Sequence, residues 1–325
     1  MPKILITGGA GFIGYHLAKH LLSDKKNQLI LVDNLQRGKM DADLAQLIKN
    51  KRIKFINADL TNSTFYKTLD KNFDQVYHLA AINGTKIFYA IPQEVLRINT
   101  LTLIYILEWI KNLKKKPKLC FTSSNEAYAG ALEAFGQLPI PTPENIPLVI
   151  NDTYNPRWSY GATKLVGELF VIFYAKAYNF PAVIVRPHNF YGPRAGYDHV
   201  IPEFIGRVAK KVDPFPIYGA DDTRTFCYID DAVKAMQMLM DSKKTDCQPI
   251  ATVHIGATDE IAMLDLAKKL FAIIGWTPKK IDIKESPTGS VKRRLADITK
   301  IKKLVGWTPK ISLNDGLTKT IEWYC

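Results

Sequence analysis

Apolar and polar residues alternate along the first half of the chain in two different rhythms. Short apolar runs predict buried strands at Lys3–Thr7, Leu29–Val32, Ile53–Asn57, Gln75–Leu79, Lys118–Thr122 and Ala182–Val185. Longer segments with helical spacing predict helices at Phe12–Leu22, Pro92–Leu113 and Tyr160–Tyr178. Because strands and helices alternate, we expect an α/β fold with a doubly wound parallel sheet that helices cover on both faces.

The pattern becomes less regular after Arg186. Proline, glycine and aromatic residues are frequent in the segment that follows, which is typical of loops. A helix at Asp231–Met240 and a strand at Thr252–Ile255 then predict a return to the first sheet. We therefore expect a first domain over residues 1–187, to which residues 226–255 return, and a smaller, interwoven C-terminal domain over residues 188–325.

The composition limits the function classes. The chain has 325 residues, of which 47% are hydrophobic and 23% are charged, as in folded domains and unlike disordered chains. No apolar run approaches the roughly 18 residues of a membrane span, and the N-terminus reaches Gly8 too soon for a signal peptide. The four cysteines show no CxxC spacing and favour neither a disulfide scaffold nor a zinc site. We expect a cytoplasmic protein with no metal site and no membrane partner.

The charge is unusual, because 44 Lys and Arg residues stand against 31 Asp and Glu residues and give a net charge of +13. A basic balance of this size can mark a surface that binds nucleic acid. The longest basic cluster, Lys114–Lys118, contains a proline and is not interleaved with aromatic residues that could stack on bases. We therefore expect a lysine-rich solvated surface and no nucleic-acid partner.

A glycine-rich loop follows the first predicted strand. Residues 7–14 read TGGAGFIG and lead directly into a predicted helix. Gly8, Gly11 and Gly14 permit a tight turn, a close approach of the backbone to a pyrophosphate, and close packing of the helix on the strand. The N–H groups and the positive dipole end of the helix then face the phosphates. Strand, loop and helix together predict a dinucleotide-binding site.

Asp33 ends the second predicted strand, at the distance from the glycine loop that this motif requires. A carboxylate there accepts hydrogen bonds from the ribose hydroxyls and repels a 2′-phosphate, which favours NAD over NADP. Arg37 and Lys39 follow closely and favour NADP, so both cofactors stay open at this point. Asp59 and Leu60 either contact the adenine or form an ordinary helix cap.

A second motif places a phenol and an ammonium group on one helix. Tyr160 and Lys164 are one turn apart and share a face. The pKa of a free phenol is about 10, and a nearby cation favours the phenolate. Such a tyrosine can take a proton from a substrate hydroxyl while hydride leaves the same carbon for a nicotinamide ring. The motif alone is weak, but its place downstream of a dinucleotide loop indicates a dehydrogenase site.

These motifs, together with Asp33-Asn34 and the sequence HLAA at residues 78–81, resemble the extended short-chain dehydrogenase/reductase family. More narrowly, the chain is similar to its nucleotide-sugar epimerase/dehydratase branch from residue 3 to about residue 312. The resemblance implies a Rossmann fold, an NAD cofactor and a nucleoside-diphosphate sugar as substrate. It also implies a homodimer formed by the helices near residues 92–112 and 160–178.

The resemblance assigns roles to residues after the fifth strand and on the following long helix. Ser124 occupies the family's catalytic Ser/Thr position, and Tyr160 and Lys164 are the catalytic base and its partner. Glu126 stands where related dehydratases have a base, whereas Asn125 replaces the acid that they often carry beside it. Because an amide cannot donate a titrating proton, the sequence supports the first half-reaction, oxidation at C4, better than the second.

The resemblance further implies two sets of binding residues. The cofactor-binding set is Gly8, Gly11, Phe12, Ile13, Gly14, Asp33, Asn34, Asp59, Leu60, Leu79, Ala80, Ala81, Asn99, Tyr160 and Lys164. The substrate-binding set is Ser124, Asn125, Glu126, Asn189, Arg224 and Arg293, with Arg294 as the alternative to Arg293 and a surface salt bridge as the alternative role of Arg224. His188 stands where the family often has phenylalanine, and it is either a structural residue or a substrate contact.

The combined motifs predict an NAD-dependent nucleotide-sugar epimerase, which oxidises C4 and then reduces the 4-keto sugar from the other face. An NDP-sugar 4,6-dehydratase and a UDP-glucuronate-type decarboxylase, both using Glu126, are the alternatives. A third class, a regulator that binds NAD without catalysis, is disfavoured because Ser124, Tyr160 and Lys164 are all present.

Overall fold

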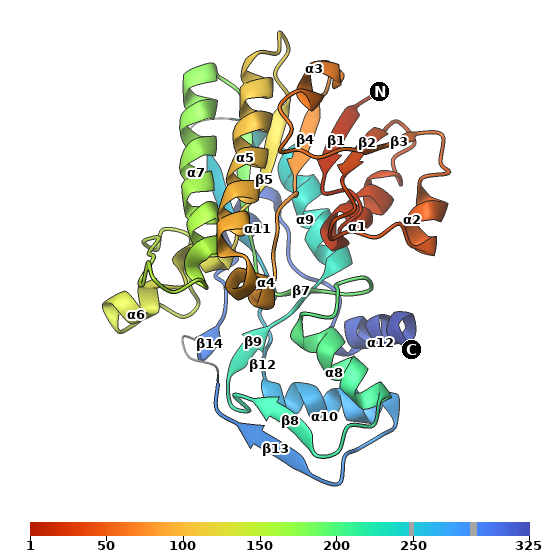
Figure 1. Cartoon of the computed structure of the whole chain (residues 1–325), viewed down its shortest axis with the longest axis vertical. Coiled ribbons are helices and arrows are strands. Elements are labelled where there is room, and N and C mark those ends of the chain that lie inside the picture. Colours follow the sequence, from red (N-terminus) through yellow and green to blue (C-terminus); the bar gives the residue numbers. More distant parts are fainter. Residues whose placement is uncertain (247–249, 287–290) are drawn as a thin grey trace.

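A seven-stranded parallel sheet forms the centre of the computed structural model, which describes residues 1–246, 250–286 and 291–325 (Figure 1). The strand order is β11-β6-β5-β4-β1-β2-β3, and every neighbouring pair is parallel. The strands are β1 (Lys3–Thr7), β2 (Gln28–Asp33), β3 (Ile53–Asn57), β4 (Gln75–His78), β5 (Lys118–Thr122), β6 (Ala182–Pro187) and β11 (Ala251–Ile255). The expected α/β class and doubly wound sheet are therefore confirmed.

Helices cover both faces of this sheet, as the periodic pattern predicts. On one face α5 (Pro92–Lys111) packs against α7 (Trp158–Tyr178), and on the other α1 (Phe12–Leu21) packs against α9 (Ile229–Asp241) (Figure 1). Along β1, Leu5 belongs to the core beneath α5 and α7, whereas its two neighbours in the sequence belong to the core beneath α1 and α9. Because successive side chains enter opposite cores, the strand reads as a continuous apolar run.

A smaller lobe lies beneath the carboxyl ends of the central strands (Figure 1). Its helices are α8 (Val200–Ala209), α10 (Met263–Ile274) and α12 (Leu313–Tyr324). Its short sheets pair β7 (Phe190–Tyr191) with β10 (Cys227–Tyr228), β8 (Phe215–Tyr218) with β13 (Ile281–Lys284), and β9 (Thr223–Thr225) with both β12 (Glu260–Ala262) and β14 (Arg293–Arg294). The chain leaves the sheet after β6, contributes to this lobe and returns as β11, which pairs with β6.

The predicted bounds of the long elements agree with the structure to within two residues. For example, α7 begins at Trp158 rather than Tyr160, so Tyr160 lies in its first turn. Short helices join the longer elements: α2 (Ala42–Leu47), α3 (Phe65–Thr68), α4 (Thr85–Ala90), η1 (Asn125–Tyr128), α6 (Ala131–Phe135), η2 (Lys243–Thr245) and α11 (Thr299–Val305). The sequence did not indicate these, because so few residues do not establish a hydrophobic period.

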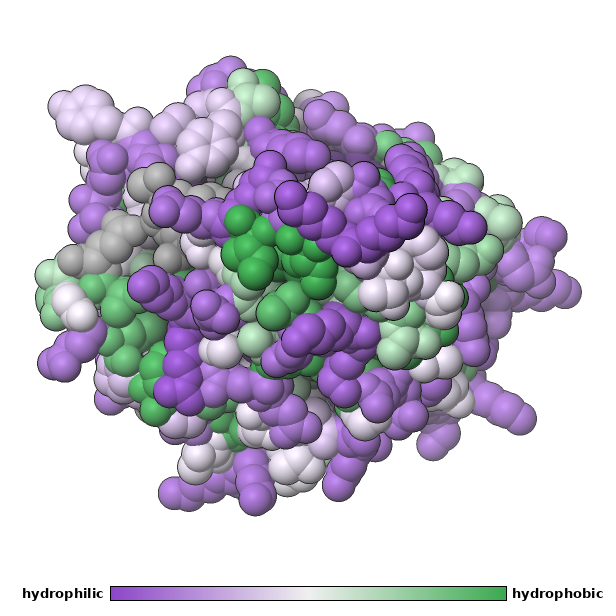
Figure 2. All heavy atoms as spheres, turned by 90° about the horizontal axis from the view of Figure 1, so that it is seen from below, coloured by the Kyte–Doolittle hydropathy of each residue, from purple (hydrophilic) through white to green (hydrophobic). Residues whose placement is uncertain are grey.

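Hydrophilic side chains cover most of the face seen from below, and hydrophobic residues gather there in small areas between them (Figure 2). Most lysines in the described part of the chain are exposed. Lys118 is an exception, because its Nζ donates to the carbonyl oxygens of Leu239 and Ser242 at 3.2 and 2.8 Å and so fixes the end of α9 beside the start of β5. Within the described residues, no helix is both long and apolar enough to cross a membrane.

Candidate active site

The loop between β1 and α1 leaves little room for side chains. Gly8 has a φ of +73°, and a Cβ there would lie 2.9 Å from the backbone nitrogen of Ala80. A Cβ on Gly14 would lie 2.1 Å from the carbonyl oxygen of Gly8, so the start of α1 rests directly on the loop. Gly11 precedes α1 without a side-chain cap, and the first turn carries no acidic residue. The N–H groups at this helix end can therefore receive a pyrophosphate, which fits an NAD cofactor.

Asp33 lies at the carboxyl end of β2, beside the glycine loop. Its Oδ2 accepts a hydrogen bond from the backbone N–H of Ala10 at 3.0 Å, and its Oδ1 accepts one from Leu35 at 2.8 Å. Burial raises the pKa of Asp33, although these two backbone hydrogen bonds oppose the rise. The two contacts hold the carboxylate at the position where a ribose diol meets it in dinucleotide sites.

A cleft of about 630 Å³ extends from the glycine loop to the ends of β5 and β6. Its volume is in the range of cofactor and small-molecule sites. The predicted cofactor-binding residues that line it are Gly8, Gly11, Phe12, Ile13, Gly14, Asp33, Asn34, Asp59, Leu60, Leu79, Ala80, Ala81, Tyr160 and Lys164. The predicted substrate-binding residues that line it are Ser124, Asn125, Glu126 and Asn189.

Ser124 and Tyr160 come together at one end of this cleft. Ser124 follows β5 and accepts a hydrogen bond from the backbone N–H of Glu126 at 3.1 Å, which starts η1. The ring of Tyr160 stacks on that of Phe88, with 5.0 Å between the ring centroids. Burial and the charge of Glu126 raise the pKa of Tyr160, and its hydrogen bond with Ser124 acts in the opposite direction. The hydroxyl of Ser124 thus favours the phenolate that a catalytic base requires.

Lys164 lies one turn further along α7, facing the same end of the cleft. Its Nζ lies 5.4 Å from the centroid of the Tyr160 ring and donates a hydrogen bond to the carbonyl oxygen of Thr122 at 2.7 Å. Burial lowers the pKa of Lys164 to about 7, although the charge of Glu168 acts to raise it. Near neutral pH the ammonium group can therefore lose its proton more readily than an ordinary lysine does.

A buried ion pair holds α7 against the strands that carry the site. Arg186 on β6 donates to Glu168 on α7 through Nε at 2.8 Å and Nη2 at 2.7 Å, and both side chains are only 4% exposed. The hydroxyl of Ser123 donates to the same carboxylate at 2.5 Å. This network connects β5, β6 and α7, and so positions Ser124 relative to Tyr160.

Glu126 meets two arginines at the same end of the cleft. Its Oε1 accepts from Nη1 of Arg294 at 2.7 Å, and its Oε2 lies 3.5 Å from Nη2 of Arg157. Burial acts to raise the pKa of Glu126, but the charges of Arg294 and Arg157 outweigh it, so that the pKa is lowered. The carboxylate is therefore ionised at neutral pH and bound to two cations.

The two neighbouring arginines of β14 lie differently relative to the cleft. Arg293, which the sequence favours as a substrate contact, points away from the cleft, is 57% exposed and pairs with Glu260 at 2.6 Å. Arg294, the alternative, lines the cleft. Successive residues of a strand point to opposite sides, which is why only Arg294 lines the cleft.

Arg224 and Asn99 also lie outside the cleft. The guanidinium of Arg224 is 15% exposed and lies 3.7 Å from the carboxylate of Asp222, so this pair is not the surface salt bridge that the sequence left as its alternative role. A substrate contact of Arg224 stays a prediction. Asn99 is buried: its Oδ1 accepts from the backbone N–H of Ile82 at 2.7 Å, and its Nδ2 donates to the carbonyl oxygen of Ile82 at 3.1 Å. Asn99 therefore positions the loop after β4, and its contact with the cofactor stays a prediction.

The sequence did not indicate Arg157 or Glu168, which help to build the site. Arg157 directly precedes α7 and Glu168 lies in its buried face, and neither belongs to a recognisable motif. A charged residue at a buried position of a helix was the available signal for Glu168. Among the described residues, no group of three His, Cys, Asp or Glu side chains is placed to hold a metal ion.

Comparisons with known proteins agree with this geometry. A family model described as GDP-mannose 4,6 dehydratase matches residues 5–320. The UDP-N-acetyl-alpha-D-glucosaminuronate decarboxylase of Bacillus cytotoxicus is 33% identical over 99% of this chain and 97% of its own. The dTDP-D-glucose 4,6-dehydratase of Homo sapiens is 31% identical over 99% of this chain and 89% of its own.

The chain is also similar to a solved structure that contains both a nucleotide sugar and a dinucleotide cofactor. The UDP-glucuronic acid 4-epimerase of Bacillus cereus, in complex with UDP-glucuronic acid and NAD, matches with a TM-score of 0.87 and 30% identity, covering 99% of this chain and 98% of that one. The reactions that the names of these similar proteins state therefore differ. This chain belongs to the extended short-chain dehydrogenase/reductase family of NAD-dependent nucleotide-sugar epimerases, dehydratases and decarboxylases.

Proposed function

We propose that this protein is an NAD-dependent nucleotide-sugar 4-epimerase. The observation that carries the proposal is the meeting of Ser124, Tyr160 and Lys164 at the end of a cleft that begins at the glycine loop. NAD bound along that cleft supplies the hydride acceptor for oxidation at C4 and the hydride donor for the return step.

The residues of the chain handle the proton. Tyr160 takes the proton of the C4 hydroxyl as the C4–H bond breaks, so that a C4 ketone forms. Ser124 donates a hydrogen bond to the same oxygen, and Lys164 holds the nicotinamide ribose. When the ketone is reduced from its other face, Tyr160 returns the proton and the configuration at C4 is inverted.

The environment of Glu126 favours epimerisation over dehydration. A dehydratase must remove a proton from carbon and deliver another to the departing hydroxyl. Glu126 is an ionised carboxylate bound by Arg294 and Arg157, which weakens it as a base, and Asn125 offers no acid. Epimerisation needs neither group, which is why we favour it.

Decarboxylation is the second candidate, favoured by the same two arginines. If the sugar is a uronic acid, oxidation at C4 creates a β-keto acid. The C5–C6 bond can then break, with CO₂ leaving and the electron pair moving into an enolate that is protonated at C5. Arg294 and Arg157 supply positive charge at this end of the cleft, where a sugar carboxylate would need it.

The products formed in deuterated water test these readings. The protein with NAD is incubated with UDP-glucose, UDP-glucuronate and dTDP-glucose, and proton NMR follows the sugar. A 4-epimerase inverts C4 and leaves the ring carbons undeuterated, a dehydratase deuterates C5 and creates a methyl group, and a decarboxylase yields a pentose. Binding of NAD without turnover of any sugar would favour the regulator instead.

We further infer that two copies associate through α5 and α7. Val166, Leu169 and Phe173 follow one another on one face of α7 and are 41%, 46% and 61% exposed, and Leu96 on α5 is 44% exposed. Side chains of this size rarely remain in water on two adjacent helices of a monomer. A homodimer would bury them as a four-helix contact.

A further inference from the structure

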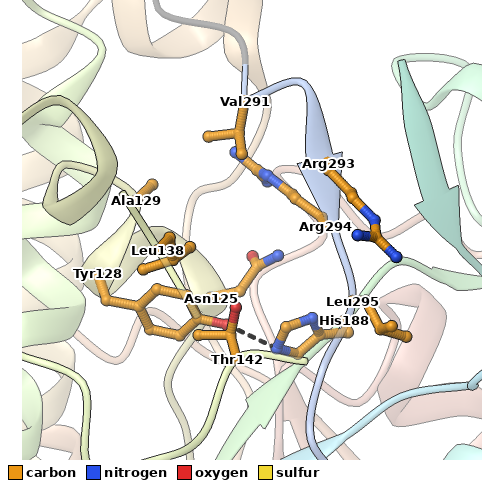
Figure 3. Close-up of a pocket in the computed structure, with 10 residues that line it drawn as sticks. All are labelled: Asn125, Tyr128, Ala129, Leu138, Thr142, His188, Val291, Arg293, Arg294 and Leu295. Atoms are coloured by element: carbon orange, nitrogen blue, oxygen red, sulfur yellow. Dashed lines mark hydrogen bonds between the residues drawn. The ribbon is translucent and has the colours of Figure 1, made fainter. Parts of the chain in front are cut away.

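A small pocket adjoins the cleft at its reacting end (Figure 3). Its volume is about 10 Å³, which is room for one oxygen atom. Two of its lining residues, Asn125 and Arg294, also line the cleft that contains Ser124 and Tyr160. Apolar side chains such as Leu138 and Val291 close some of its sides, and its polar lining residues are Asn125, Tyr128, Thr142, His188, Arg293 and Arg294.

His188 is held rigidly at this pocket. It directly follows β6, its backbone N–H donates to the carbonyl oxygen of Ile255 at 2.9 Å, and its side chain is buried. Its Nε2 lies 2.8 Å from the hydroxyl of Tyr128, the contact drawn in Figure 3. The imidazole therefore has one fixed orientation, with Nδ1 as its remaining polar atom.

Nδ1 of His188 has no hydrogen-bond partner among the described residues, although it is buried. Figure 3 shows this edge of the ring and the amide of Asn125 facing the space below Arg294. A buried polar atom without a partner is unfavourable, so such atoms usually have a ligand or water as partner. Burial and the nearby His254 and Arg294 also lower the pKa of His188 well below its usual value. The ring is therefore neutral, and Nδ1 is either a donor or an acceptor.

Resting on the proposed function, we propose that Nδ1 of His188 binds one oxygen of the sugar, which belongs to the substituent on one of the two carbons next to C4. Tyr160 and Ser124 place C4 at this end of the cleft, and only groups on its two neighbouring carbons are close enough to enter the pocket. The candidates are the 3-hydroxyl and the exocyclic oxygen on C6. His188 is then a specificity-determining residue, and a phenylalanine at this position would lack the contact.

Two substitutions of His188 test the contacts of its two ring nitrogens one at a time. In His188→Asn the amide reaches the place of Nδ1, whereas in His188→Gln it reaches the place of Nε2 and keeps the contact with Tyr128. His188→Gln should weaken the binding of UDP-glucose about 3- to 10-fold, the value of one hydrogen bond, and leave UDP itself unchanged. His188→Asn should stay within about twofold of the parent for both ligands.

The direct measurement observes the nitrogen itself. Protein labelled with ¹⁵N-histidine and carrying Tyr160→Phe, which prevents turnover, is saturated with NAD and titrated with UDP, UDP-glucose or UDP-xylose. The Nδ1 resonance of His188, assigned by its loss in His188→Gln, should move with UDP-glucose and not with UDP. UDP-xylose lacks C6, so a response like that of UDP assigns the contact to the C6 oxygen, and a response like that of UDP-glucose assigns it to the 3-hydroxyl.

The outcomes distinguish this inference from the proposed function. If UDP-glucose binds more tightly than UDP but the Nδ1 resonance does not move, the pocket holds only a water molecule and the inference is wrong, whereas the function stands. Equal affinity of His188→Gln and His188→Asn for UDP-glucose has the same meaning. If no nucleotide sugar binds better than its nucleotide, the proposed function fails and this inference fails with it.

Discussion

The carboxylate of Glu126 lies 2.7 Å from the guanidinium of Arg294, and this ion pair joins the end of β5 to β14 at the reacting end of the cleft. The other carboxylate oxygen lies 3.5 Å from Arg157. A carboxylate held by two cations has little tendency to take a proton from carbon. The pair therefore indicates a positioning role for Glu126.

Glu126→Gln tests this role. Because no proton transfer passes through Glu126 in an epimerase, we expect kcat to fall less than about tenfold, whereas removal of a general base costs about 10²- to 10⁴-fold. Tyr160→Phe removes the proposed base and is the matched variant, so its kcat should fall about 10²- to 10⁴-fold. Initial rates from the NMR assay measure both. A loss for Glu126→Gln as large as that for Tyr160→Phe would identify the carboxylate as a base.

Two glycine substitutions should have different effects: one should weaken NAD binding, and the other should stabilise the fold. Gly14→Ala places a Cβ 2.1 Å from the carbonyl oxygen of Gly8, so the loop must shift and the affinity for NAD should fall at least tenfold. A Cβ on Gly206, inside α8, meets nothing within 4 Å. Gly206→Ala should therefore raise the free energy of unfolding by about 0.5–1 kcal/mol and leave NAD binding unchanged. Calorimetric titration and urea unfolding measure the two effects.

The ion pair between Arg186 and Glu168 should carry a large share of the local stability. Glu168→Gln leaves the buried guanidinium without its counter-charge, and we expect a loss of about 3–5 kcal/mol in the free energy of unfolding. Glu94→Gln breaks the exposed pair with Arg97 and is the control, for which we expect no measurable change. Equal midpoints of urea unfolding for the two variants would contradict the prediction.

Acid should destabilise the fold through its buried histidines. Burial lowers the pKa of His16 to about 4 and those of His78 and His254 to about 3, below the ordinary value of 6.5. Below pH 6.5 the unfolded chain therefore binds protons that the folded chain does not, and stability falls as the pH falls. Below pH 6.5 each of the three costs about 1.4 kcal/mol per pH unit, so these three rings together contribute a loss of about 4 kcal/mol between pH 7 and 5.5.

Urea unfolding at several pH values measures this loss, and its slope gives the number of protons taken up. The variant His254→Phe should take up one proton fewer on unfolding at pH 5.5. A free energy of unfolding that stays constant from pH 7 to 5.5 would show that these rings are protonated in the folded state.

The proposed dimer can be broken at one residue. Phe173 on α7 is 61% exposed, and Phe173→Glu would place a charge in the four-helix contact, so sedimentation should show a monomer. Tyr218 on β8 is 48% exposed and belongs to the smaller lobe, away from α5 and α7 (Figure 1), so Tyr218→Glu should remain dimeric. A parent protein that sediments as a monomer would contradict the inference.

The sequence predicted those parts of the site whose geometry is local. The glycine loop and the pair of Tyr160 and Lys164 follow from the backbone and from the period of one helix. The choice between Arg293 and Arg294 was not local, because strand alternation separates the two without saying which of them faces the cleft. That choice depends on the pairing of β14 with β9, a contact between distant parts of the chain. His188 posed the same problem, since nothing near it in the sequence indicates Tyr128 as its partner.

The pairing of β11 with β6 has a consequence for how the protein is made. Val183 and Ala251 are neighbours in the sheet, yet residues 188–250 must leave the ribosome between them. Until then the edge of β6 is unpaired. Closing so long a loop costs conformational entropy, and no local contact offsets this cost before β11 pairs with β6. Docking of β11 is therefore a late event in biogenesis, and the open edge of β6 is where a chaperone, or an aggregating neighbour, meets the nascent chain.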